Sequence, residues 1–234
     1  MVEITWLGHA TFQLKLESGE IIVLDPWIDG NPKYPKSHTF SRVDAILISH
    51  GHFDHIHDAI PLAKRFHPKK VVAIFETCHW LEKKGVQNCS GMNKGGTQDV
   101  CGGLRATQVH AVHSCGILDG DQIVYGGEAS GYVLHFPDGR TAYFAGDTNV
   151  FSDMSLIEQL YKPELAFLPI GDHFTMSPHE AALAARLLKA RTIIPMHFGT
   201  FPLLTGTPDG LAEQLRDSPE LRVWPLEIGK PVGW

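Results

Sequence analysis

The chain has 234 residues, of which 43% are hydrophobic and 20% are charged, a usage typical of a folded globular protein rather than a disordered chain. The net charge is −6 and no long run of basic residues is present, so the composition does not favour binding to nucleic acid or to an anionic membrane. A chain of this length is commonly one domain, and we expect a single domain spanning residues 1–234.

The sequence shows neither a recognisable targeting segment nor a motif of paired cysteines. No segment approaches the roughly 18 apolar residues that span a bilayer, and the opening MVEITWLGHATFQLKL lacks the pattern of a secretory signal. We therefore expect a cytoplasmic protein. The cysteines are widely spaced, which favours free thiols over a disulfide framework or a zinc ribbon. They are Cys78, Cys89, Cys101 and Cys115.

The first part of the chain predicts strands followed by helices. Short apolar or alternating segments predict strands at 3–8, 11–17, 20–26, 43–49 and 69–76. A helix is expected at 57–67, where Pro61 is tolerated only in the first turn. A second helix is expected at 77–85, closed by Gly85, and the glycine-rich segment 86–103 is expected to be mostly loop.

The second part repeats this order. Strands are expected at 104–114, 122–127, 130–136, 141–147, 164–171, 191–199 and 221–229. Ser177, Pro178 and Glu180 match an N-cap, a first-position proline and a capping-box glutamate, so a helix is expected over 177–190. A last helix is expected from Thr207 to about Asp217.

Two halves that each run from strands to helices and back to strands predict two sheets packed face to face. With the helices outside, this is an α/β fold of four layers.

The stretch SHGHFDHIHD, residues 49–58, is the densest group of chemically active side chains. His50 and His52 are two apart after an extended run, so both can point to one side of the turn. Asp54 and His55 follow as the chain bends into a helix and can point to a second position nearby. This spacing suits two neighbouring metal ions, and imidazole with few carboxylates favours zinc, with manganese, iron or nickel as alternatives.

Further ligands for such a site must come from elsewhere in the chain. Candidates that follow apolar strands are His113 in VHAVHSCG, Asp147 in YFAGDTN and His197 in IIPMHFGT. The carboxyl ends of strands are where α/β folds place their sites.

These motifs carry a resemblance to a known family. SHGHFDH resembles the H-x-H-x-D-H motif of the metallo-β-lactamase fold superfamily, and AGDT and MHFGT resemble its later ligand motifs in the same order. WLGHATFQL, LDP and LPIG are similar to a narrower branch of uncharacterised metal-dependent hydrolases, related to N-acyl-phosphatidylethanolamine phospholipase D and ascorbate-6-phosphate lactonase. The resemblance runs from residue 4 to about residue 201.

The resemblance implies an αββα sandwich with two metal ions at one edge of the sheets. It places His50, His52 and His113 on one ion, Asp54, His55 and His197 on the other, and Asp147 between them. It also implies that Asp25, in LDP, orients a ligand imidazole. Two ions at such a spacing supply a hydroxide near neutral pH, so hydrolysis of an ester or lactone, an amide or a phosphodiester is expected.

One ligand has a close competitor in the sequence. His110 lies three residues before His113, and strand alternation would place the two on opposite faces. We choose His113 because it directly precedes SCG, where relatives have a similar sequence. Cys115 is then expected close to the metals.

Other polar residues near the motifs have weaker claims. His9 and His173 follow apolar strands and are candidates for proton donor or oxyanion partner as well as for a structural role. Asp54 is counted as a catalytic candidate in addition to its ligand role. His57 and Asp58 are expected to begin a helix outside the site.

Three other functions compete with the hydrolase. An iron-dependent oxidoreductase of the same fold, of the sulfur dioxygenase type, uses similar ligands. A phosphodiesterase or nuclease is a second alternative, although the acidic balance disfavours a nuclease. The complete ligand set argues against a non-catalytic scaffold. We expect a small-molecule substrate and no nucleic-acid partner, while the sequence leaves a homo-oligomer open.

Overall fold

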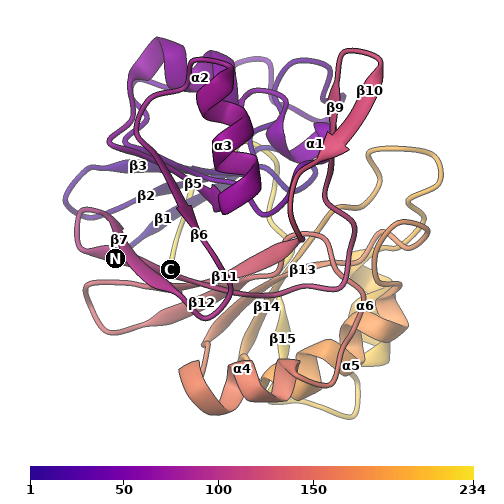
Figure 1. The fold of residues 1–234 in the computed structure, drawn as a ribbon. Helices are drawn as coiled ribbons and strands as arrows, with labels where there is room; N and C mark the ends of the chain where they lie inside the picture. Colours follow the sequence, from indigo (N-terminus) through magenta and orange to yellow (C-terminus); the bar gives the residue numbers. More distant parts are fainter.

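The protein was analysed as a computed structural model that describes residues 1–234. Two sheets lie against each other in the middle of the molecule, and helices cover the outer face of each (Figure 1). The layer order is helix, sheet, sheet, helix. The expected four-layer αββα sandwich is therefore confirmed.

The first sheet is built mainly from the amino-terminal part of the chain. Its order is β16-β1-β2-β3-β4-β5-β6, with antiparallel pairing from β16 to β3 and parallel pairing from β3 to β6. The strands are β1 Glu3–Trp6, β2 Phe12–Lys15, β3 Ile21–Leu24, β4 Ala45–Leu47, β5 Lys70–Ile74, β6 Cys89–Met92 and β16 Val232–Gly233. Its helices are α1 Phe53–Ile56, α2 Ala59–Phe66 and α3 Phe75–Lys83.

The second sheet has a related design. Its order is β15-β14-β13-β12-β11-β8-β7, antiparallel from β7 to β12 and parallel from β12 to β15. The strands are β7 Thr97–Cys101, β8 Leu104–His110, β11 Ser130–His135, β12 Thr141–Phe144, β13 Leu165–Pro169, β14 Thr192–Met196 and β15 Arg222–Val223. Its helices are α4 Met154–Tyr161, α5 Pro178–Leu188 and α6 Pro208–Gln214.

A separate hairpin projects from the sandwich beside α1 (Figure 1). It consists of β9, Gly116–Asp119, and β10, Gln122–Tyr125, which pair only with each other. The hairpin is therefore part of neither seven-stranded sheet.

The central strands are apolar on both faces because each face is covered. In β3, Ile22 and Leu24 enter the main core of 45 buried residues, which lies between the sheets and also includes side chains of α4, α5 and α6. Ile21 and Val23, on the other face, join a smaller core of 16 buried residues that includes side chains of α2 and α3. Period-2 alternation thus distributes a continuous apolar run between two cores.

The helix-start signals predicted at Ser177 and at Pro61 are found in the structure. The Ser177 side chain accepts a hydrogen bond from the Glu180 N–H while the Glu180 carboxylate accepts one from the Ser177 N–H, which is a complete capping box. Pro61 is the third residue of α2, inside the first turn, where its missing N–H has no intrahelical partner to lose.

The expectation for residues 86–103 was wrong. Instead of a loop, this segment holds β6 and β7, the outermost strands of the two sheets. Edge strands are short and polar because one side faces solvent, so they lack the apolar pattern of central strands. The same reasoning explains why β16 and β9 were not expected. Helix α4 was also missed, and the strand expected at 221–229 shortens to the two residues of β15.

The longest helix, α5, has 11 residues. None of the helices combines the length and the apolar composition that crossing a membrane requires.

Candidate metal centre

The predicted ligands meet at one edge of the sandwich. They lie in loops or a short helix that follow strands: His50 and His52 after β4, Asp147 after β12 and His197 after β14. Because these strands run parallel to a neighbour in their sheets, their carboxyl ends reach the same edge. We call the seven converging residues the His/Asp cluster. They are His50, His52, Asp54, His55, His113, Asp147 and His197.

His50, His52 and His113 form the first half of the cluster. Each offers a ring nitrogen, and these nitrogens lie within 4.8 Å of one another. His52 Nδ1 is 3.2 Å from His113 Nε2. The expected strand alternation between His110 and His113 was wrong, because β8 ends at His110 and His113 comes from the loop beyond it. His113 nevertheless lies in the cluster, whereas His110 contacts Lys94.

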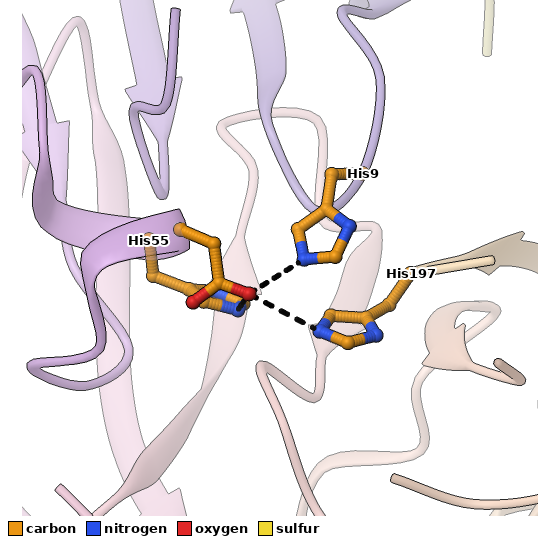
Figure 2. Close-up of side chains that lie close together, drawn as sticks. His9, His55 and His197 are labelled. Carbon is orange, nitrogen blue, oxygen red and sulfur yellow. Dashed lines mark hydrogen bonds and ion pairs between the residues drawn. The ribbon is translucent and has the colours of Figure 1, made fainter. Parts of the chain in front are cut away.

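Asp54, His55 and His197 form the second half. Asp54 Oδ2 lies 3.8 Å from His197 Nε2 and 4.0 Å from His55 Nε2. Figure 2 shows the imidazoles of His55, His197 and His9 converging from three separate parts of the chain. Asp54 and His55 lie in the short helix α1, whereas the sequence placed them in the bend before a helix at 57–67. His197 comes from the loop after β14, in the other sheet.

The carboxylate of Asp147 lies between the two halves. Its Oδ2 atom is 3.7 Å from His113 Nε2 and 3.9 Å from His50 Nε2, on the side of the first half. The same atom is 3.0 Å from His197 Nε2 and 3.3 Å from His55 Nε2, on the side of the second half. One oxygen thus faces nitrogens from both groups.

Buried hydrogen bonds fix the ring orientations of two ligands. The Asp25 carboxylate accepts hydrogen bonds from the N–H and the hydroxyl of Ser49, and from His55 Nδ1–H at 2.7 Å. Because the Ser49 hydroxyl donates to Asp25, its oxygen accepts from His50 Nδ1–H at 2.9 Å. In their neutral forms both histidines therefore present the lone pair of Nε2 toward the cluster.

Several of these atoms lack any hydrogen-bond partner. They are His50 Nε2, His55 Nε2, Asp147 Oδ1 and both ring nitrogens of His197. Orphaned polar atoms in a buried position are unfavourable unless something else binds them. Nitrogen lone pairs and a carboxylate oxygen pointing at the same space are the donor set of a transition-metal site, so the residues fit bound divalent ions.

Without metal, the carboxylates and imidazoles shift one another's pKa. Burial would lower the pKa of His197, but Asp147 outweighs it and raises the pKa to about 9. Burial would raise the pKa of Asp147, but His197 and His55 hold it well below its usual range. For His50, burial and the charge of His55 both lower the pKa. Protons thus occupy part of the space that metal ions would take.

His9 lies directly behind Asp54. Its Nε2–H donates to Asp54 Oδ2 at 2.9 Å, and its Nδ1 accepts from the Thr200 hydroxyl at 3.0 Å. Burial, reinforced by the charge of His197, lowers the pKa of His9 to about 4, so the ring is neutral at neutral pH. The structure thus places His9 where it can orient Asp54.

Three residues around the site have the left-handed backbone conformation that favours glycine. They are His9, Asp25 and His197, with φ of 55°, 42° and 57°. The His197 N–H also donates to the His9 carbonyl, so the two loops support each other. Such backbone strain is typical of functional sites, where the surrounding structure enforces it.

The remaining candidates have different surroundings. Cys115 is buried; its sulfur accepts from the Gly51 N–H and donates to the Gly126 carbonyl, both at 3.3 Å, and burial raises the pKa of its thiol. It therefore supports the backbone between His50 and His52. His173 is exposed on the loop before α5, beside Phe174. His57 is half exposed and contacts Asp58, away from the cluster.

Two contributors were not expected from the sequence. Ser49 connects His50 to Asp25, and the Thr200 hydroxyl contacts His9. Both lie inside the quoted motifs SHGHFDH and MHFGT, close to a proposed ligand. This proximity is the only signal in the sequence that could have pointed to them.

Comparison with known proteins gives consistent results. Residues 20–198 match the model of a beta-lactamase superfamily domain. The chain is 70% identical to a UPF0173 metal-dependent hydrolase of Solibacter usitatus, over the full length of both chains. It is 46% identical to another, from Rubrobacter xylanophilus, covering 98% of this chain and 96% of that one.

A solved structure is also similar. Igni18, described as a novel metallo hydrolase from the archaeon Ignicoccus hospitalis, is 34% identical with a TM-score of 0.85. The similarity covers 99% of this chain and 97% of that one.

Proposed function

The chain belongs to the beta-lactamase superfamily as a metal-dependent hydrolase of the UPF0173 type, and from this premise we propose that it works with two metal ions. In this proposal His50, His52 and His113 would hold one ion, Asp54, His55 and His197 would hold the other, and Asp147 would contribute to both. A small molecule is the substrate.

The position of Asp147 Oδ2 is the observation that carries the proposal. It lies within 3.9 Å of nitrogens from both halves of the His/Asp cluster. A site for one ion would not need a carboxylate oxygen that faces two separate groups of ligands. The orphaned nitrogens on each side support the same assignment.

The donor set favours zinc. It holds five imidazoles and two carboxylates, which suits borderline metals such as zinc, with manganese, iron and nickel as alternatives. When bound, two such ions lower the pKa of water enough to supply hydroxide near neutral pH, and they stabilise negative charge on the substrate oxygen.

The residues of the chain contribute orientation and proton handling. Asp25 keeps His55 Nε2 aimed into the site, and His9 keeps Asp54 in place. In the proposed mechanism Asp54 also accepts a proton during the reaction, because it is the cluster carboxylate that both touches His9 and lines the open cavity. His173 remains a predicted proton donor from the loop at the cavity mouth.

Metal content and hydrolysis test the proposal together. We expect purified protein to hold two metals per chain and to hydrolyse members of a panel of esters, lactones, amides and phosphodiesters. Asp147→Ala and His50→Ala should lose metal and at least about 100-fold in kcat/KM, more than the loss of a supporting residue costs.

The control is His79→Ala, which removes an exposed histidine on α3 and should match wild type in both measurements. A wild-type protein with fewer than one metal per chain, or an Asp147→Ala variant as active as wild type, would exclude the proposal. Iron in protein purified without added metal, together with thiol-dependent oxygen uptake, would favour the oxidoreductase alternative.

A further inference from the structure

A large cavity opens above the His/Asp cluster. Its volume is about 1000 Å³, at the upper end of the range for ligand pockets. Asp54, Asp147 and His197 form part of its floor. Six apolar side chains form its sides, and we call them the apolar wall. They are Phe53, Leu118, Ile123, Phe174, Phe201 and Leu203.

The apolar wall is unusually open to solvent. Ile123 is 79% exposed and Leu118 56%, and on other loops Leu203 is 53% and Phe174 52% exposed. A single exposed apolar residue is ordinary, but a group around one opening marks a binding surface. Burying these side chains against a ligand would remove this apolar area from water.

The hairpin of β9 and β10 is held so that it keeps its apolar face over the cavity. Leu118 and Ile123 are cross-strand partners, and therefore their side chains lie on the same face. Ile117, on the opposite face, is buried, with its side chain close to Gly51. At the hairpin turn, the Asp119 carboxylate accepts hydrogen bonds from Trp80 of α3 and from Lys84, directly after that helix.

The charge of the cavity separates the candidate substrates. No Lys or Arg lines it, and all its titratable side chains belong to the His/Asp cluster. In addition to metal ions, proteins commonly use Arg, Lys or helix amino-termini to bind phosphate groups. A phosphodiester would therefore find few partners here, whereas a neutral apolar group would find a complete wall.

We propose that the site takes a neutral carboxylic ester or amide that carries a long apolar chain, with the chain against the apolar wall. This inference rests on the proposed function and narrows its substrate. Water adds to the carbonyl carbon, the bond from that carbon to the leaving oxygen or nitrogen breaks, and the leaving group takes up a proton. The products are a carboxylic acid and an alcohol or amine.

Chain length is the first test. Against 4-nitrophenyl esters from acetate to decanoate, below their micelle concentrations, kcat/KM should rise about two- to fourfold per methylene, since each buried methylene favours binding. Bis(4-nitrophenyl) phosphate should be a poor substrate. Rates that do not depend on chain length, or a preference for the phosphodiester, would overturn the inference.

Matched variants locate the effect. Ile123→Ser should reduce kcat/KM for the decanoate at least about tenfold more than it reduces kcat/KM for the acetate. Leu160→Ser, which changes a similarly exposed apolar residue on α4 outside the cavity, should match wild type. A decanoate rate that is the same in Ile123→Ser and wild type would count against the apolar wall.

A binding measurement separates this inference from the proposed function. The neutral probe N-phenyl-1-naphthylamine should fluoresce on binding to wild type and Leu160→Ser, and should bind at least about fivefold more weakly to Ile123→Ser. If the protein holds no metal and hydrolyses nothing, the proposed function fails, but this binding pattern would still support an apolar ligand. If the metals and hydrolysis are present and the probe binds all three proteins equally, only the inference fails.

Discussion

The floor and the apolar wall of the cavity differ in burial and in polar contacts. In the His/Asp cluster, His50, His55 and Asp147 are almost completely buried, and hydrogen bonds to Ser49 and Asp25 fix two of the rings. In the apolar wall, most side chains are exposed and hold no polar contacts. Metal chemistry requires ligand positions that are fixed in advance, whereas apolar recognition depends mainly on area. We expect substitutions in the floor to change metal binding and rate, and substitutions in the wall to change substrate preference.

After removal of a proposed ligand itself, the largest effect should come from removing a residue that supports the floor of the cavity. Asp25→Asn replaces a carboxylate that accepts three hydrogen bonds, so His55 loses its charged partner and its fixed tautomer. We expect a 10- to 100-fold loss of metal affinity, the usual magnitude for such supporting residues. Competition with a chromophoric chelator measures it. Asp121→Asn, at the exposed hairpin turn, is the control, and equal affinities in the two variants would show that Asp25 is not needed.

Proton competition should be nearly as visible. In the metal-free protein the pKa of His197 is raised to about 9, so the ring is protonated below that pH and must lose a proton before binding metal. Metal affinity should therefore rise about tenfold per pH unit for each proton displaced, and level off above about pH 9. Titrations of zinc at pH 7, 8 and 9 test this. An affinity that is constant across this range would contradict it.

A smaller effect should follow from loosening the wall. Asp119→Ala removes the contacts that tie the hairpin to Trp80 and Lys84, leaving the floor intact. We expect kcat/KM for a long-chain ester to fall about threefold to tenfold, with little change in metal affinity. Amide hydrogen exchange across 116–125 should increase. Asp121→Ala, two residues along the same turn, controls for the loss of a carboxylate; a similar response in both variants would exclude a specific role for the tie.

The smallest effect is expected from the histidine that lies in the motif but not in the cluster. His57→Ala removes a half-exposed imidazole that contacts only Asp58. Metal content and kcat/KM should stay within about twofold of wild type. A loss of metal comparable to that of His50→Ala would show that the boundary of the site was drawn in the wrong place.

The same contrast explains what could be predicted from the sequence. The proposed ligands follow apolar strands and lie in short motifs, so candidates could be named before their distances were known. They are His50, His52, Asp54, His55, Asp147 and His197. The capping box at Ser177 could be predicted equally well, because its contacts join residues only three positions apart. These features depend on local order along the chain.

The apolar wall depends on arrangement in space. Leu118 and Ile123 belong to strands of four residues, and an apolar side chain ordinarily predicts burial, so their exposure over a cavity could not be seen. Edge strands β6 and β7 were missed because their polar composition resembles that of loops. The path of His113 was misjudged for a related reason, since the end of β8 is set by its pairing with β11.

The contact between His9 and Thr200 spans 191 positions of the chain. Asp54 is therefore supported by a residue from one end of the sequence that is itself supported from near the other. On a ribosome, residues 50–55 would emerge long before His197 and Thr200. The early part of the chain would therefore contain only some of the proposed metal ligands. Contacts of such long range slow folding, and we expect metal uptake to follow the docking of the two sheets rather than to nucleate it.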